Sequence, residues 1–208
     1  MLDSIDLPLI LVAALIGAAS PGPATLAIAG TSMKSGRRHG LALATGITTG
    51  SFMWSISAAF GLGAVMLANA WAFEVLRYFG ATYLLFLAYK SARSAFKPAS
   101  TKVLGISIHS TGTAYTKGLM LHLTNPKAIL FFGSLFSIGV PAHSSIEALA
   151  VVIAAVGFQS FLIFHGYALL FSNGAVTTGY AKMRRWFEAV FAVAFGIAGF
   201  KILTARLD

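Results

Sequence analysis

One lysine of this chain follows a proline inside a long apolar run, an arrangement suited to binding an anion. It belongs to Thr124-Asn125-Pro126-Lys127-Ala128, and a second proline-broken stretch, Ser20-Pro21-Gly22-Pro23-Ala24, lies half a chain earlier in another apolar run. Because proline interrupts the helical hydrogen-bond ladder, the backbone groups freed at each break need new partners. Two helix N-termini and one ammonium group together favour a carboxylate or a phosphate.

The residues at these two breaks form the predicted substrate site. Asn125 before Pro126 places a favoured N-cap residue ahead of a proline at the first helical position, and we expect Ser20 to do the same for Pro21. In the alternative interpretation, the prolines are ordinary kinks of membrane helices and the lysine extends toward water. The predicted substrate contacts are Ser20, Pro21, Gly22, Pro23, Thr124, Asn125, Pro126 and Lys127.

The composition indicates a bundle of membrane helices. Hydrophobic residues make up 57% of the 208 residues and charged residues 10%, and the mean hydropathy is +0.81. The net charge of +9 does not point to nucleic acid, because the basic residues lie in short segments between apolar runs. The chain has no cysteine, which excludes disulfides, thiol redox chemistry and thiolate metal ligands. We predict neither a cofactor nor a metal site.

Six apolar runs are long enough to cross a bilayer as helices of about 20 residues. They cover residues 7–33, 41–67, 73–89, 118–140, 146–171 and 187–203. The expected fold is an all-α membrane protein with six transmembrane helices, of which the first and the fourth are broken.

The basic residues predict how the chain is oriented. Eleven of the 15 lysines and arginines follow the first, third and fifth apolar runs. By the positive-inside rule these segments are cytoplasmic and both termini are outside. With three spans in each half, the halves would enter the membrane in opposite directions, as two inverted repeats. The expected division is a three-helix repeat at 1–95, a cytoplasmic linker at 96–116 and a second three-helix repeat at 117–208.

Titratable residues within the apolar runs are few. His122 and His165 are the candidates for proton coupling, although membrane histidines are more often neutral hydrogen-bonding residues. Glu74, Glu147 and Glu188 are expected at helix ends, so no predicted span has an acidic residue in its interior. A lysine or arginine substrate would bury its cationic side chain and need a carboxylate of the protein as a partner. Since no span offers one, the sequence favours a neutral substrate.

Small residues recur every four positions in the second run. Ala42, Gly46 and Gly50 form a stripe that permits close helix packing. The contact can lie within the bundle or between subunits, so the sequence is compatible with both a monomer and a homo-oligomer.

Several motifs carry a resemblance to a known family. They are Ser20-Pro21-Gly22-Pro23, Gly36 with Gly40, Gly46 with Gly50, Gly80 to Leu84, and Asn125-Pro126-Lys127-Ala128. Through them the chain resembles, over nearly its whole length, the lysine exporter/RhtB family of bacterial amino-acid exporters. The resemblance implies a multi-pass secondary transporter of the inner membrane, driven by the proton motive force. Its partners would be an amino acid, protons and the lipid bilayer.

Two other functions remain as alternatives. A metal-ion exporter of similar architecture would have only scattered histidines as ligands. An intramembrane hydrolase would need Ser134 with His165, but Gly133-Ser134 lacks the glycine-flanked nucleophile pattern. We therefore expect a transporter, and not an enzyme, that exports neutral amino acids of the threonine, homoserine or leucine type.

Overall fold

The computed structural model describes residues 5–68, 70–96, 108–141 and 144–204, and between its turns this part of the chain is helical. The helices are α1 Leu7–Ala19, α2 Pro23–Ser35, α3 Arg37–Ala68, α4 Ala70–Ala95, α5 Thr111–Leu123, α6 Pro126–Gly139, α7 Ile146–Leu170 and α8 Gly174–Thr204. The chain is therefore all-α throughout the described residues, as predicted.

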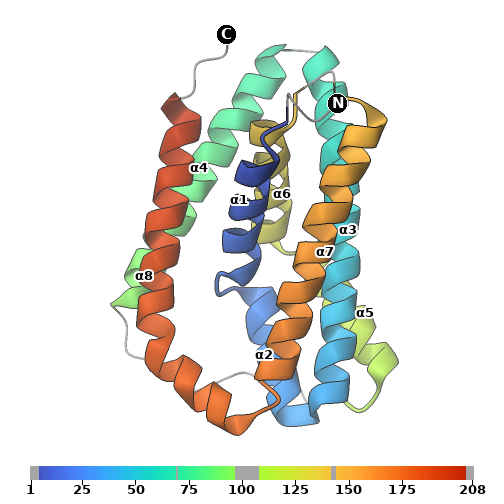
Figure 1. Ribbon diagram of the computed structural model, residues 1–208, viewed down its shortest axis with the longest axis vertical. Helices are drawn as coiled ribbons and strands as arrows, with labels where there is room; N and C mark the ends of the chain where they lie inside the picture. Colours follow the sequence, from blue (N-terminus) through green and yellow to red (C-terminus); the bar gives the residue numbers. More distant parts are fainter. Residues whose placement is uncertain (1–4, 69, 97–107, 142–143, 205–208) are drawn as a thin grey trace.

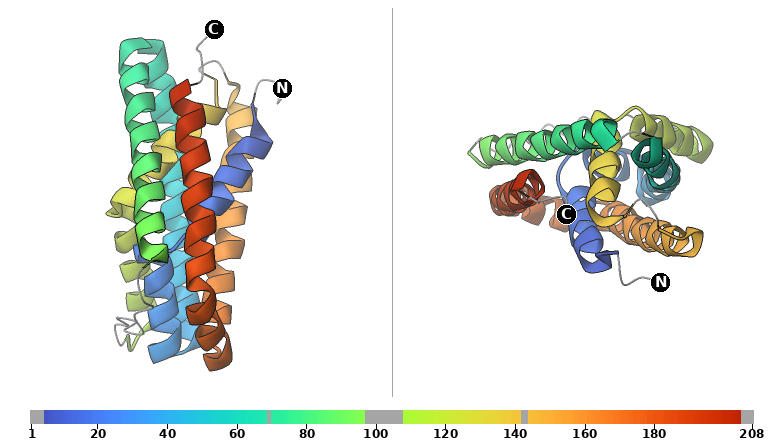
Figure 2. Two further views of the ribbon diagram at one scale, coloured as in Figure 1. Left: turned by 90° about the vertical axis from the view of Figure 1, so that its left-hand side faces the viewer. Right: turned by 90° about the horizontal axis from the view of Figure 1, so that it is seen from above.

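Two groups of helices flank a central column (Figures 1 and 2). α4 packs along α8 in one group, and α3 packs against α5 and α7 in the other. The short helices α1, α2 and α6 run between the two groups (Figure 1). One apolar core, which includes Ile10 and Phe136, surrounds α1 and α6, and a second, which includes Ile28 and Ile47, joins α2 to α3. Both parts of the first broken helix, α1 and α2, and the second part of the other, α6, thus lie at the centre of the bundle.

The first break follows from its two prolines. Ser20 precedes Pro21 and Gly22 precedes Pro23, and both have extended backbones with ψ of 140° and −177°. Proline disfavours helical backbone in the residue before it, so α2 restarts only at Pro23. The prediction that Ser20 caps the restarted helix was wrong, because Ser20 ends α1 and Gly22 precedes α2. The two helices are bent by 50° at the break.

At the second break the predicted cap is confirmed. α5 ends at Leu123 and α6 starts at Pro126, with Asn125 between them in an extended conformation. The Asn125 side chain accepts a hydrogen bond from the backbone N–H of Lys127 at 3.0 Å. This break has a single proline, so the new helix begins directly after Asn125, and the sequence pattern was sufficient here.

Several helices extend beyond the apolar runs that predict them. α3 begins at Arg37, α4 continues to Ala95 and α8 begins at Gly174. The segments predicted as basic loops are therefore partly helical, because lysine and arginine are good helix formers. α5 begins at Thr111, inside the predicted linker, and residues 97–107 of that linker lie outside the described residues.

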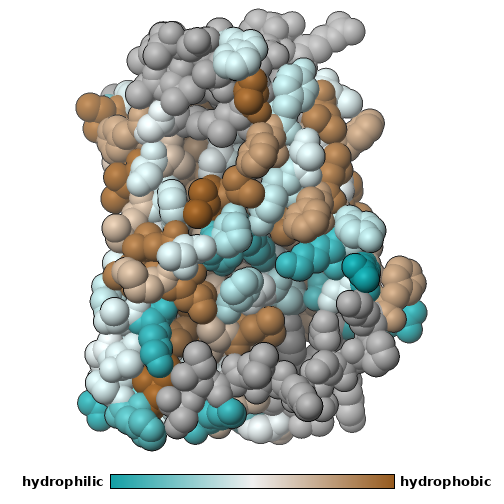
Figure 3. Space-filling view, turned by 180° about the vertical axis from the view of Figure 1, so that it is seen from behind, coloured by the Kyte–Doolittle hydropathy of each residue, from teal (hydrophilic) through white to brown (hydrophobic). Residues whose placement is uncertain are grey.

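Length and hydropathy identify two candidate membrane spans within the described residues. One is α7, and the other is the bent pair of α1 and α2; Pro126–Ser137 is apolar but shorter. These criteria do not confirm the predicted count of six spans. Large apolar side chains are nevertheless exposed on several helices, among them Trp71, Phe158, Trp186, Val190 and Phe200. Apolar residues cover much of the face in Figure 3, as a surface in contact with lipid requires.

α3 and α5 approach each other backbone to backbone. A Cβ atom on Gly46 would lie 2.0 Å from the carbonyl oxygen of Tyr115, and one on Gly118 would lie 2.2 Å from that of Leu43. No side chain fits at either position without moving a helix. The glycine stripe that the sequence indicates lies against α5 of the same chain.

We predict that Gly46→Ala and Gly118→Ala destabilise the protein by about 1–3 kcal/mol, the usual cost of overpacking. Their midpoints of thermal unfolding in detergent should fall below that of Gly166→Ala, which shares their gain in helix propensity. A Cβ atom on Gly166 meets nothing within 4 Å, so this variant is the matched control. Equal midpoints for the three variants would contradict the close contact.

Candidate functional site

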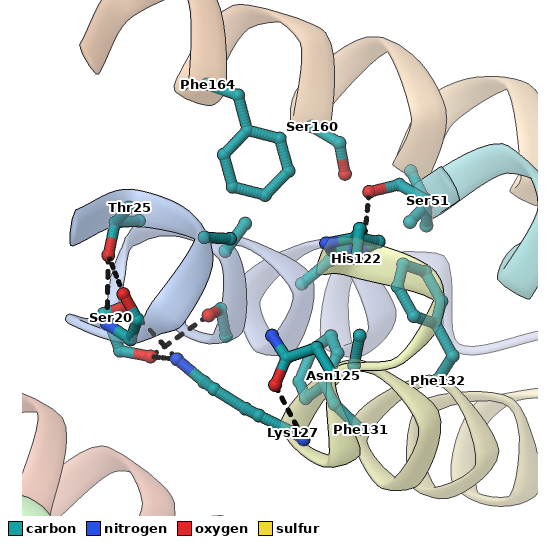
Figure 4. Close-up of a pocket in the computed structure, with 17 residues that line it drawn as sticks. Ser20, Thr25, Ser51, His122, Asn125, Lys127, Phe131, Phe132, Ser160 and Phe164 are labelled. Carbon is teal, nitrogen blue, oxygen red and sulfur yellow. Dashed lines mark hydrogen bonds between the residues drawn. The ribbon is translucent and has the colours of Figure 1, made fainter. Parts of the chain in front are cut away.

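The two proline breaks meet at one cavity inside the bundle (Figure 4). Because its walls come from both broken helices, α1 with α2 and α5 with α6, and from α3 and α7, segments far apart in the sequence share it. Its polar lining consists of Ser20, Gly22, Thr25, Ser51, His122, Asn125, Lys127 and Ser160. Its apolar lining includes Ala14, Gly17, Ala128, Phe131, Phe132, Val156 and Phe164.

Lys127 connects the two broken helices. Its Nζ atom donates a hydrogen bond to the backbone oxygen of Ser20 at 3.1 Å and another to Ser20 Oγ. The side chain passes close to Gly22, where a Cβ atom would lie 3.3 Å from Nζ. The carbonyl of Ser20 lies just past the last residue of α1, where the break removes the backbone N–H that would bond to it. The ammonium group of α6 replaces that missing donor.

Side chains also pair other backbone groups of the first break. The hydroxyl of Tyr167 on α7 donates to the carbonyl oxygen of Ala19 at 2.7 Å. At the start of α2, the backbone N–H of Gly22 donates to Thr25 Oγ1 at 2.9 Å, and that hydroxyl donates to the Gly22 oxygen at 3.1 Å. The break is thus held between α6 and α7 in a defined shape.

α8 contributes to the surroundings of the buried ammonium group. Two charged side chains act on Lys127: the negative charge of Glu188 on α8 attracts its ammonium group, and the positive charge of Lys90 on α4 repels it. Glu188 is buried and accepts a hydrogen bond from Ser94 Oγ at 2.8 Å. Phe195, two turns further along α8, has its ring centre 6.0 Å from Lys127 Nζ. An opposite charge and an aromatic ring both reduce the cost of burying a lysine.

The position of Glu188 contradicts the prediction that it lies at a helix end. α8 begins at Gly174, so about 21 Å of helix precedes Glu188. The apolar run begins only at Phe187, and the helix extends well ahead of it through a polar segment that the hydropathy pattern excluded. Glu188 faces α4 and does not line the cavity. The lining therefore has no acidic side chain among the described residues.

His122 of α5 lies in the cavity wall. Its Nε2 atom is 3.1 Å from Ser51 Oγ on α3, and its ring packs edge-on against Phe132 and Phe164. Gly50 leaves room for this packing, because a Cβ atom there would lie 3.0 Å from that of His122. The Nδ1 atom is buried without a hydrogen-bond partner in the structure.

His165 of α7 lies apart from the cavity lining. Its Nε2 atom is 3.1 Å from Thr45 Oγ1, and its Nδ1 atom is 2.9 Å from the backbone oxygen of Phe161. Both ring nitrogens therefore have partners, on α3 and within α7. The sequence could not separate the two histidines, because each occupies a similar place in an apolar run.

The other predicted contacts divide into two sets. Ser20, Gly22, Asn125 and Lys127 line the cavity. The remaining four contribute to the breaks and are absent from the lining: Pro21, Pro23, Thr124 and Pro126. Sequence analysis missed Thr25 and the aromatic residues of the wall. The spacing of Thr25, three residues after Gly22, is a capping signal that could have revealed it.

Comparison with known proteins places the chain in a family. Residues 15–206 match the family described as LysE type translocator. Over 189 residues, 90% of this chain and 92% of the relative, it is 28% identical to the threonine efflux protein of Salmonella typhi. Over 165 residues, 79% of this chain and 77% of the relative, it is 31% identical to the leucine efflux protein of Enterobacter sp. (strain 638). No solved structure matches it significantly. These matches confirm the resemblance carried by the motifs, and the chain belongs to the LysE-type translocator family.

Proposed function

We propose that this protein exports neutral amino acids across the bacterial inner membrane. The cavity at which both proline breaks meet carries the proposal, because it places an ammonium group and two helix N-termini around one buried space. Such a site favours a carboxylate. The relatives described above are named for the efflux of threonine and of leucine, two neutral amino acids, which supports the same class of substrate here.

In this proposal, Lys127 binds the carboxylate of the substrate. Without substrate, its ammonium group bonds to the oxygens of Ser20. A carboxylate is a stronger acceptor than a carbonyl or a hydroxyl, so it would replace at least one of these bonds. The starts of α2 at Pro23 and of α6 at Pro126 add their positive dipole ends. Opening the bond between Lys127 and Ser20 would at the same time loosen the contact between the two broken helices.

The rest of the cavity suits a side chain without charge. Phe131, Phe132, Val156 and Phe164 offer an apolar wall. A cationic side chain would be buried there without a carboxylate from the described lining, which is costly. Glu188 lies outside the cavity lining, bonded to Ser94, and its charge opposes that of the protein's own lysine.

The two halves are proposed to be inverted repeats in the membrane. Each begins with a broken helix and continues with two unbroken ones, α1 to α4 in the first half and α5 to α8 in the second. α1 begins and α8 ends at one end of the bundle, whereas the α2–α3 and α7–α8 turns lie at the other (Figure 1). Lys34, Arg37 and Arg38 lie at that second end, which the positive-inside rule makes cytoplasmic.

Export would be driven by the proton motive force, with His122 as the coupling residue. His122 lines the cavity and is close enough to Lys127 for their charges to interact, whereas His165, the second candidate, lies outside the cavity. A proton on His122 would add a second positive charge and repel the ammonium group of an amino acid. Proton and substrate would then exclude each other from the cavity, which is the condition for their exchange in opposite directions.

Neither alternative function gains support from the described residues. No three histidine, cysteine, aspartate or glutamate side chains gather there as a metal site would require. Ser134 Oγ donates to the backbone oxygen of Leu130 in its own helix at 2.7 Å, and His165 bonds to Thr45. Ser134 and His165 are thus each bonded to other groups, and the pair that the hydrolase would need is not formed.

We predict that Lys127→Met abolishes export while leaving the amount of protein in the membrane near normal. The variant loses the partner of the substrate carboxylate but also removes a costly buried charge. Purified protein in liposomes, tested for exchange of labelled threonine and leucine, measures the effect. Lys117→Met, which removes an exposed charge on α5, is the matched control. Normal exchange by Lys127→Met would remove this lysine from the site.

The proposed orientation predicts which ends of the bundle a thiol reagent reaches. In this cysteine-free chain, single cysteines can replace the exposed residues Pro141 and Ser172, which lie at opposite ends of the bundle. A membrane-impermeant maleimide added to intact cells should label Pro141→Cys and spare Ser172→Cys, and lysis should expose both. The reverse pattern would overturn the orientation.

We also predict that His122→Gln separates binding from coupling. The variant should still exchange labelled for unlabelled substrate across liposomes at equal pH, because Lys127 and the helix ends remain. It should lose export driven by an imposed proton gradient. His165→Gln, measured in parallel, should respond to the gradient as the unmodified protein does. If it is His165→Gln that loses the response, the coupling residue is His165.

A further inference from the structure

We propose that Nδ1 of His122 accepts a hydrogen bond from a hydroxyl group on the substrate's side chain. The cavity would thereby select hydroxy amino acids over aliphatic amino acids of the same shape. This inference rests on the proposed function and specifies which neutral side chains the site favours.

The starting observation is a polar atom left without a partner. Four buried side-chain polar atoms of the described residues have no hydrogen bond: Ser32 Oγ, Ser55 Oγ, His122 Nδ1 and Gln159 Oε1. Among these residues, His122 alone lines the cavity, and only 5% of its surface is exposed. Because an unpaired polar group inside a protein is costly, its position in a binding cavity points to a ligand that pairs with it.

The neighbours of His122 decide which nitrogen carries the proton. Ser51 Oγ donates its single proton to the backbone oxygen of Ile47 at 3.2 Å. It can then only accept from Nε2 of His122, 3.1 Å away, so this network assigns the ring proton to Nε2. Nδ1 is left with a lone pair and needs a donor. A hydroxyl can donate to that lone pair, and an aliphatic side chain cannot.

The location of His122 fits the side-chain end of an amino acid. Figure 4 shows the ring beside Ser51, Ser160 and Phe164, on the other side of Asn125 from the Lys127 ammonium. With the carboxylate at Lys127, the substrate side chain extends toward this aromatic wall. The rings of Phe132 and Phe164 pack edge-on against His122, with centres 6.3 and 5.9 Å away. Ser51 and Ser160 also line this part of the cavity, but the Ser51 hydroxyl is already bonded to Ile47 and His122.

Threonine and valine test the inference, because they differ only by a hydroxyl in place of a methyl group. Both are offered as unlabelled competitors of labelled leucine exchange in liposomes at equal pH. Threonine should compete about tenfold better than valine, since valine leaves the buried nitrogen unpaired. His122→Gln should bring the two within about twofold of each other, because a glutamine amide reaches the Nε2 position and leaves Nδ1 without a substitute.

Two further variants provide the controls. His122→Asn places an amide near the Nδ1 position and should restore part of the preference for threonine. His165→Gln makes the same substitution outside the cavity and should leave the ratio between threonine and valine unchanged. Folding defects would lower exchange of all substrates together and would not change this ratio.

The outcomes separate this inference from the proposed function. If the unmodified protein exchanges leucine but does not distinguish threonine from valine, the role of His122 is wrong and the transport function stands. The same holds if the preference survives in His122→Gln. If no neutral amino acid is exchanged at all, the proposed function fails, and this inference fails with it.

Discussion

Every backbone N–H and C=O group freed by a proline inside a membrane needs a partner from the protein, and this requirement shapes the centre of the molecule. The carbonyl of Ser20 is paired by the ammonium group of Lys127, and that of Ala19 by the hydroxyl of Tyr167. Each bond joins the first break to a helix from the other half of the chain. The two halves of the chain are therefore joined at the cavity, by bonds that include the one the proposed substrate carboxylate would replace.

Burying a lysine to meet this requirement has consequences for helices that never touch the cavity. Glu188 and Phe195 occupy one face of α8 and bring an opposite charge and an aromatic ring toward Lys127. Ser94 on α4 holds the carboxylate of Glu188 in place. The extensive packing of α4 along α8 thus positions the groups that stabilise the charge at the centre of the bundle. A substrate carboxylate at Lys127 would interact electrostatically with the charged side chains of both helices.

The cavity combines a general part and a selective part. In the proposed function, the general part is the ammonium group with the two helix ends, which would bind the carboxylate of any amino acid. The selective part is the wall around His122, where a single nitrogen lies among phenylalanine rings. Relatives named for threonine and for leucine efflux show that substrates within this family differ in the side chain. Selectivity is therefore expected to depend on the wall and not on the breaks.

Sequence reasoning succeeded where the cause is local. Proline acts on the residue before it, so the extended backbones of Ser20 and Asn125 follow from their neighbours, as does the cap of α6. The predicted start of α2 was wrong by two residues, because the second proline keeps Gly22 extended and the helix begins only at Pro23. Sequence reasoning also placed Glu188 at a helix end, since hydropathy cannot show where a helix continues through polar residues.

What the tertiary structure alone decided are the contacts between distant segments. Only the packing of the helices brings Lys127 to Ser20, places His122 in the cavity while His165 bonds to Thr45, and sets Gly46 against the backbone of Tyr115. Composition, the two breaks and the family motifs could be read directly from the chain. The pairs of polar atoms that come into contact could not be predicted from the sequence, because they depend on how each helix is rotated about its own axis. A shift of one residue rotates the helix by about 100° and turns a cavity-lining side chain away.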